Sequence, residues 1–131
     1  MKQFIFVFLI AISIITSCSQ PKNEIQTVSP QEVYDAVYNK SNSSLQIVDV
    51  RTAEEYGVSH LKDAQNICVT EADFKEKVKT LDKDKPVYVY CKSGGRSAKA
   101  SKILADLGFT KIYDLDGGIT AWEKDGLETN E

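Results

Sequence analysis

Short runs of apolar residues alternate along this chain with longer stretches in which apolar residues recur every three or four positions. The runs predict buried strands, which we place at residues 45–50, 65–68, 86–91 and 111–115. The stretches between the runs predict amphipathic helices. Strands that alternate with helices in this way favour an α/β fold in which helices flank a central parallel sheet.

The helix after the third strand has the clearest apolar stripe, and Gly108 ends it. The stripe consists of Ala100, Ile103, Leu104 and Leu107. A shorter helical turn at residues 119–124 carries Trp122. We expect this tryptophan in the core, with stacking on a ligand as the alternative.

Two of the predicted helices begin at capping boxes, in which a hydroxyl residue precedes a glutamate by three positions. Ser29 and Glu32 form the first box, and Pro30 favours a helix start between them. Thr52 and Glu55 form the second box directly after the first strand. These boxes place helix starts at Pro30 and just after Thr52.

The start of the chain has a different pattern. A short basic opening at residues 1–3 precedes an almost wholly apolar run from Phe4 to Ile15. This run is shorter than the about 20 apolar residues of an ordinary membrane-spanning helix. Residues 1–17 therefore predict a secretory signal peptide.

The residues that follow indicate a lipid anchor. Ile15-Thr16-Ser17-Cys18 is similar to a bacterial lipobox, which implies a lipidated Cys18, with an ordinary cleaved signal as the alternative. Residues 18–27 are polar and predict the lipidated N-terminus and a tether. We therefore expect an exported protein, anchored by lipid at the periplasmic face of a bacterial membrane.

The rest of the 131-residue chain suits one domain, which we place at residues 28–127, with a tail at 128–131. The formal net charge of −3 and the scattered basic residues do not indicate a nucleic-acid partner. With one histidine and three scattered cysteines, we expect no metal site and no cofactor.

The candidate chemistry lies at Cys91, where the third strand ends and the next helix begins. Residues 91–97 are Cys-Lys-Ser-Gly-Gly-Arg-Ser. The adjacent glycines let backbone N–H groups turn toward the sulfur, and the helix start adds its positive end. Lys92 and Arg96 add two cations, and such surroundings lower the pKa of a thiol. We predict a thiolate nucleophile at Cys91; the alternative is a buried, inert cysteine.

Three motifs of the chain resemble the rhodanese (sulfurtransferase) family. They are the loop from Cys91 to Arg96, the segment from Ile47 to Ile67, and Leu115-Asp116-Gly117-Gly118-Ile119-Thr120-Ala121-Trp122. Four residues separate Cys91 from Arg96 here, whereas the related cell-cycle tyrosine phosphatases have five. The shorter loop suits a sulfur atom better than a tetrahedral phosphate.

The resemblance implies a three-layer rhodanese-like domain in which Cys91 carries a persulfide. The sulfur would come from a small donor such as thiosulfate and pass to cyanide or to a thiol. Asp49 and Arg51 would support the loop, with a plain surface ion pair as the alternative for Arg51. The resemblance also implies a structural role for His60 in its loop, with a general base as the alternative. The loop residues expected to bind the substrate are Lys92, Ser93, Gly94, Gly95, Arg96 and Ser97.

Two other functions stay open at this point. The first is a persulfide carrier or interaction module that uses the same loop without turnover of small donors. The second is a phosphatase or an arsenate reductase, which the loop length disfavours.

Cys68 lies outside the three motifs, near the end of the second predicted strand. Because Cys91 also ends a strand, both thiols should lie on the same edge of a parallel sheet. If their strands are adjacent or the loop is mobile, Cys68 could attack the Cys91 persulfide and release sulfide. This would leave a Cys68–Cys91 disulfide that a thioredoxin-like protein reopens. The alternative is that Cys68 is a small buried hydrophobic residue.

Overall fold

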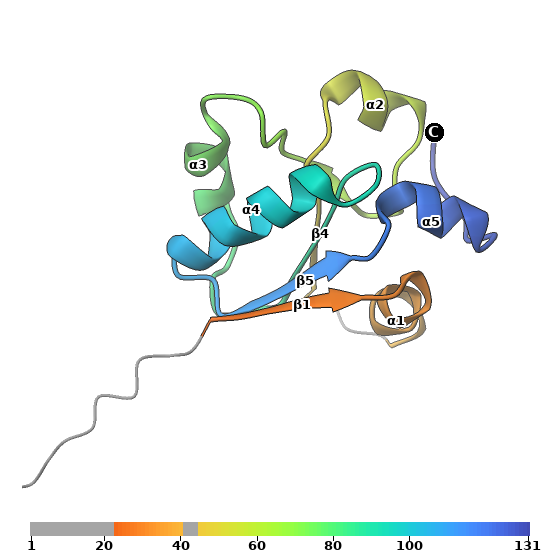
Figure 1. The fold of residues 1–131 in the computed structure, drawn as a ribbon, viewed down its shortest axis with the longest axis horizontal. Coiled ribbons are helices and arrows are strands. Elements are labelled where there is room, and N and C mark those ends of the chain that lie inside the picture. The colour runs from red at the N-terminus through yellow and green to blue at the C-terminus, as the bar shows by residue number, and fades with distance from the viewer. Residues whose placement is uncertain (1–22, 41–44) are drawn as a thin grey trace, which may run out of the picture.

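The computed structural model describes residues 23–40 and 45–131 (Figure 1). The predicted signal peptide and Cys18 lie outside the described residues. The strands are β1 (Glu24–Val28), β2 (Gln46–Asp49), β3 (Gln65–Asn66), β4 (Val87–Tyr90) and β5 (Lys111–Leu115). The helices are α1 (Pro30–Tyr34), α2 (Ala53–Val58), α3 (Phe74–Lys77), α4 (Gly95–Asp106) and α5 (Gly118–Lys124). A π-helical turn at Asp35–Asn39 extends α1, and a 3₁₀ turn at Val78–Thr80 extends α3.

All strands are parallel and lie in the order β1-β5-β4-β2-β3. This arrangement confirms the predicted α/β fold with helices around a central parallel sheet. Asp49 at the end of β2 pairs in register with Tyr90 at the end of β4. The loops after β2 and β4 therefore leave the sheet side by side, and Cys91 begins one of them.

Two hydrophobic layers hold the helices on opposite faces of the sheet (Figure 1). On one face, α3 and α4 pack through Phe74, Ala100 and Leu104 against apolar side chains of β2 and β4. On the other face, α1 and α5 pack around Trp122, which is fully buried and hydrogen-bonds the Glu128 carbonyl. The prediction of Trp122 as a core residue is confirmed.

Both predicted capping boxes are present. The Ser29 hydroxyl accepts from the Glu32 N–H, and the Glu32 carboxylate accepts from the Ser29 N–H. Thr52 and Glu55 form the same pair of bonds at the start of α2. Because the second box follows β2 directly, it fixes the position of Glu55 at the carboxyl edge of the sheet.

The predicted tether is wrong for residues 24–27, which belong to the edge strand β1. Backbone pairing with β5 holds this strand, from Glu24 beside Lys111 to Val28 beside Leu115. Its first four residues are exposed, including Ile25. Such a strand needs no apolar run, because its stability comes from hydrogen bonds to its neighbour, and so periodicity gave no signal for it.

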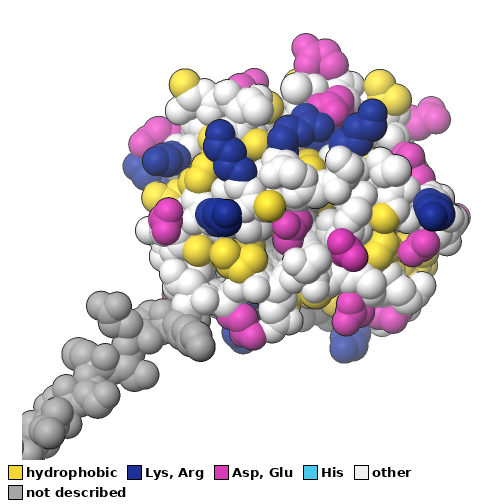
Figure 2. Space-filling view, in the orientation of Figure 1, with side chains coloured by type: hydrophobic (Ala, Val, Ile, Leu, Met, Phe, Trp, Pro, Cys, Tyr) yellow, Lys and Arg dark blue, Asp and Glu magenta, His cyan; other side chains and the backbone are white. Residues whose placement is uncertain are grey.

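The surface of the described part carries both signs of charge. Figure 2 shows Lys and Arg side chains over the α4 side of the molecule, with Asp and Glu side chains spread between and around them. None of the helices in this part is long and apolar enough to cross a membrane.

Candidate active site

The loop after β4 folds around the sulfur of Cys91. The Gly94 N–H donates to Cys91 Sγ at 3.1 Å, and the Ser97 hydroxyl lies 3.5 Å from the same sulfur. Gly94 precedes α4 with a φ of +118°, a backbone conformation that residues other than glycine rarely adopt. The Ser97 hydroxyl also donates to the Gly94 carbonyl at 3.2 Å, which ties the first turn of α4 to the loop.

This geometry lowers the pKa of Cys91 below its ordinary value. Burial of the side chain acts in the opposite direction, since it disfavours the charged thiolate. Hydrogen bonds from the Ser97 hydroxyl and from the N–H groups of Ser97, Gly94 and Ser93 outweigh that effect. The loop can therefore hold a negative charge on the sulfur that stands at its centre.

Helix α5 holds the loop from the other side. The Ile119 N–H donates to the Cys91 carbonyl at 2.9 Å, and the Thr120 N–H donates to the Lys92 carbonyl at 3.1 Å. Gly118, with a φ of +61°, lies so close that a Cβ there would stand 2.5 Å from the Cys91 carbonyl oxygen. The Gly117-Gly118 pair of the third motif therefore allows a backbone contact that fixes the loop.

Asp49 and Arg51 form a buried ion pair beside the loop. Arg51 Nε donates to Asp49 Oδ1 at 2.9 Å, and Arg51 Nη2 donates to Asp49 Oδ2 at 2.6 Å. The Arg51 side chain is 5% exposed and that of Asp49 is fully buried, so the alternative of a surface ion pair is wrong. Arg51 Nη2 also donates to the Ser59 carbonyl at 2.6 Å and thereby joins β2 to the end of α2.

Arg96 is engaged by a carboxylate that the sequence analysis treated only as a helix cap. Its Nη1 and Nη2 donate to Glu55 Oε2 and Oε1 at 2.6 and 2.8 Å. This contact holds the pKa of Glu55 at about 2, with a smaller contribution from the Thr52 bonds. Glu55 and Arg96 stand 41 positions apart, so no local pattern pointed to the pair.

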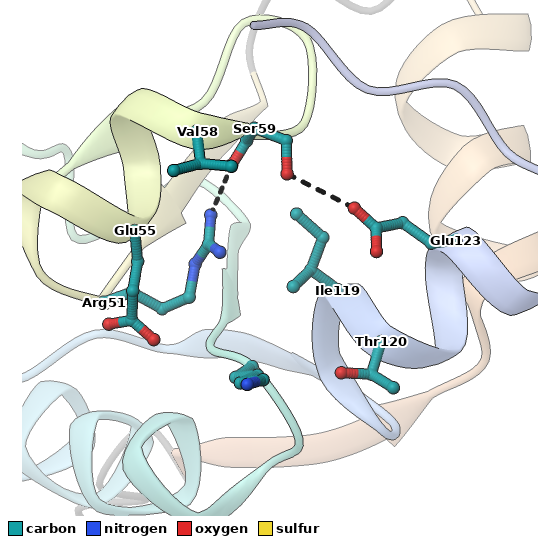
Figure 3. A pocket seen from close by; sticks show the side chains of 8 residues that line it. Arg51, Glu55, Val58, Ser59, Ile119, Thr120 and Glu123 are labelled. Carbon is teal, nitrogen blue, oxygen red and sulfur yellow. Dashed lines mark hydrogen bonds between the residues drawn. The ribbon is translucent and has the colours of Figure 1, made fainter.

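The remaining cation of the loop, Lys92, is exposed and makes no ion pair within the described part of the chain. It borders a cavity of about 220 Å³ between α2 and α5 (Figure 3). The cavity is lined by Arg51, Glu55, Val58, Ser59, Lys92, Ile119, Thr120 and Glu123. No sequence motif predicted a function for the side chains of Ser59, Thr120 or Glu123.

Asp114 of β5 is a second titratable group that the sequence analysis did not single out. Its side chain is buried, and Oδ1 has no hydrogen-bond partner among the described residues. Burial raises the pKa of Asp114, and the nearby Asp116 charge adds to this, while a hydrogen bond with Ser97 acts against it. A buried carboxyl group therefore lies behind the serine that contacts the Cys91 sulfur.

Cys68 and Cys91 do not lie on adjacent strands. Cys68 follows the edge strand β3, and β2 lies between β3 and β4, the strand that precedes Cys91. Two strand spacings amount to roughly 9.6 Å, more than the about 6.8 Å between Cα atoms that a disulfide allows. Both thiols are buried and unbridged, and Cys68 Sγ lies 3.1 Å from the Thr70 hydroxyl. The condition of adjacent strands is therefore not met, and Cys68 is a small buried side chain, as the alternative stated.

Contacts with Tyr56 fix the orientation of the His60 ring. Its ring stacks on Tyr56 with 3.9 Å between centroids, and Nδ1 lies 3.0 Å from the Tyr56 carbonyl. The His60 backbone pairs with Asn130 near the C-terminus. Over residues 23–40 and 45–131, no group of three His, Cys, Asp or Glu side chains could hold a metal ion.

Known proteins with a similar sequence or fold cover most of the part of the chain that the structure describes. The family model of the rhodanese-like domain matches residues 29–125. The putative sulfurtransferase YtwF of Bacillus subtilis is 37% identical over 100 residues, which cover 76% of this chain and 89% of that protein. The thiosulfate sulfurtransferase GlpE of Actinobacillus pleuropneumoniae is 28% identical over 100 residues, which cover 76% and 88%.

A solved structure with the same fold is the rhodanese-related protein of Thermoplasma volcanium. It superimposes with a TM-score of 0.69 at 28% identity and covers 80% of this chain and 97% of its own. The family match extends over most of the part that the structure describes, from the helix start at Ser29 to the end of α5. This chain belongs to the rhodanese-like domain family.

Proposed function

We propose that this protein is a sulfurtransferase that carries a sulfane sulfur as a persulfide on Cys91. The observation that supports the proposal most directly is the set of N–H and hydroxyl groups around a sulfur whose pKa is lowered. The sulfurtransferase names of YtwF and GlpE, two relatives of similar length, support the same class of reaction.

In the first step, the Cys91 thiolate attacks the outer sulfur of a donor such as thiosulfate. A new bond forms between Cys91 Sγ and that sulfur, the S–S bond of thiosulfate breaks, and sulfite leaves with the bonding electron pair. The N–H groups of the loop stabilise the charge on the persulfide. In the second step, cyanide or a thiolate attacks the outer sulfur, and Cys91 regains its electron pair as a thiolate.

Mass spectrometry of the unreduced protein tests the first step. After incubation with thiosulfate, we expect a mass gain of one sulfur atom in the parent and no gain in Cys91→Ser. Steady-state rates with thiosulfate and cyanide should give parallel double-reciprocal lines, because the two substrates react in separate steps. Intersecting lines would contradict a persulfide intermediate.

A persulfide carrier is the second candidate, since the Cys91 side chain is almost wholly buried and could store a sulfur. A carrier would gain the mass of one sulfur but would not turn over thiosulfate and cyanide. Cys91-dependent hydrolysis of an aryl phosphate, measured on the same preparation, would instead favour a phosphatase.

We also propose that the protein is exported and lipid-anchored at the periplasmic face of a bacterial membrane. The signal-peptide and lipobox pattern of residues 1–18 supports this proposal. Labelling of cells with radioactive palmitate should mark the parent and not Cys18→Ser. Equal labelling of the two would overturn the anchor.

A further inference from the structure

The cavity between α2 and α5 adjoins the reactive loop through two of its lining residues. Lys92 directly follows Cys91, and the Thr120 N–H binds the Lys92 carbonyl at 3.1 Å. With a volume of about 220 Å³ and about 30 Å³ per water-sized group, the cavity can hold a molecule of roughly seven non-hydrogen atoms. A small molecule can therefore bind beside the loop that begins at Cys91.

The guanidinium of Arg51 offers hydrogen-bond donors to this cavity. Its Nε and Nη2 are used by Asp49 and the Ser59 carbonyl, whereas Nη1 has no acceptor among the described residues. Figure 3 shows the guanidinium between Ser59 and Ile119, at the wall of the cavity. The buried pair with Asp49 fixes the group in place, so its donors are already oriented for a carboxylate.

Some of the charged side chains that line the cavity form ion pairs within the protein, and others do not. The charge of Arg51 is balanced by Asp49, and that of Glu55 by Arg96. Within the described part, no ion pair engages Lys92 or Glu123, and the Glu123 carboxylate only accepts from the Ser59 hydroxyl at 3.2 Å. One cation beside the loop and one carboxylate on α5 therefore remain for a bound molecule.

We propose that this cavity binds the acceptor of the sulfur atom, and that the acceptor is a small thiol with both a carboxylate and an ammonium group. The carboxylate binds Arg51 Nη1 and the Lys92 ammonium, and the ammonium group binds the Glu123 carboxylate. This inference rests on the proposed function, because it names the molecule that discharges the Cys91 persulfide.

The transfer itself needs no further reactant. The acceptor thiol loses its proton to solvent, and the resulting thiolate attacks the outer sulfur of the persulfide. The bond between that sulfur and Cys91 Sγ breaks, its electron pair stays on Cys91 as a thiolate, and the acceptor leaves as a persulfide.

The test uses single-turnover discharge of protein that has been loaded with sulfur to the same extent, as checked by mass. Three thiols serve as acceptors: cysteine, which has both charged groups, 3-mercaptopropionate, which has only the carboxylate, and cysteamine, which has only the ammonium group. For each thiol, the rate of a variant is divided by the rate of the parent, so that differences in thiol reactivity cancel.

Lys92→Met should lower the rates with cysteine and 3-mercaptopropionate about tenfold and leave the rate with cysteamine unchanged, because one charge-assisted contact is lost. Glu123→Gln should lower the rates with cysteine and cysteamine and leave the rate with 3-mercaptopropionate unchanged. The matched control is Lys124→Met, because Lys124 is exposed beside Glu123 on α5 and does not line the cavity.

The outcomes separate the two proposals. If Cys91 never gains a sulfur atom, the proposed function and the acceptor site both fall. If Cys91 is loaded and discharged but each variant changes the three rates by the same factor, the acceptor site alone is overturned.

Discussion

The guanidinium of Arg96 binds the Glu55 carboxylate, so the substitution Arg96→Ala should affect the position of the loop. Arg96→Ala releases the start of α4 from Glu55, so the N–H groups that face the Cys91 sulfur lose their fixed positions. We expect kcat/KM for thiosulfate to fall roughly ten- to hundredfold in a folded protein. Glu55→Gln should lower it in the same direction, whereas Glu54→Gln, an exposed neighbour on α2, should not.

The Glu55 variant decides how Arg96 acts. If Arg96 contributed through its charge on the substrate, removing its carboxylate partner would keep or raise kcat/KM while Arg96→Ala lowered it. That pair of results would contradict a positioning role for Arg96.

The same ion pair predicts a dependence of stability on pH. The pKa of Glu55 is about 2 in the folded protein, below its ordinary value of 4.5, so folding favours the ionised form. The stabilisation is complete above pH 4.5 and is lost as the pH falls from about 4.5 through about 2. Relative to Glu55→Gln, the parent should gain about 1 kcal/mol at pH 6, since water screens the partly exposed pair.

Urea unfolding of both proteins between pH 2 and pH 6 measures this difference. It should shrink toward zero at the acid end of the range. A difference that stays constant over the whole range would show that the variant acts through the lost Thr52 cap and not through the charge.

Helix α5 contacts the loop through the backbone of Gly118, and Gly126 provides a glycine of similar φ without such a contact. Gly118 and Gly126 both have positive φ, but a Cβ at Gly118 would meet the Cys91 and Lys92 carbonyl groups, whereas nothing lies within 4 Å of a Cβ at Gly126. Gly118→Ala should cost about 2 to 3 kcal/mol of stability and Gly126→Ala about 1 kcal/mol.

Only the Gly118 variant should also slow the loading of Cys91, because α5 has to move away from the loop. The free energy of unfolding and the rate of sulfur loading check the two parts. Equal losses of stability in the two variants would show that the backbone contact contributes nothing beyond the strain of a positive φ.

Burial of the Asp114 carboxyl group on strand β5 destabilises the folded protein at neutral pH. Because the pKa of Asp114 is raised, folding favours its neutral form, and that contribution is lost as the pH rises through the raised pKa. Asp114→Asn removes the buried negative charge and should stabilise the protein at pH 7 by about 1 kcal/mol. This stabilisation should disappear below the ordinary pKa of 3.8, where the Asp114 carboxyl group is neutral in both the folded and the unfolded protein.

Thermal unfolding at pH 7 and pH 3.5 tests this prediction, with the exposed Asp84→Asn as the control. A variant that is less stable than the parent at pH 7 would show that the Asp114 carboxylate is itself a required hydrogen-bond partner of Ser97.

The elements that the sequence predicts are those whose signals are local. Buried β2 and β4 have apolar runs, α1 and α2 have capping boxes, and α4 has a stripe that ends at Gly108. Strand β1 has no such signal, because it is an exposed edge strand held by its neighbour. The Arg96–Glu55 pair and the cavity depend on how distant segments meet, and the spacing of residues along the chain does not contain that information.

The order of the strands in the sheet determines whether the two thiols can form a disulfide. Because β2 separates β3 from β4, oxidation of the folded protein should give no linked Cys68–Cys91 peptide. Cys68→Ala should turn over as the parent does. Peptide mapping of the non-reduced protein checks this, and a linked peptide in high yield would mean that the loop moves far from the position described.

The bonds from α5 to the carbonyl groups of Cys91 and Lys92 also set an order of events during biosynthesis. The nucleophile is synthesised before the residues that hold its loop, which run from Gly118 to Thr120. A nascent or truncated chain that lacks α5 has the cysteine without the support of its loop. The support of the loop is therefore complete only after α5 has been synthesised, so a chain that stops before α5 should gain sulfur on Cys91 more slowly than the parent.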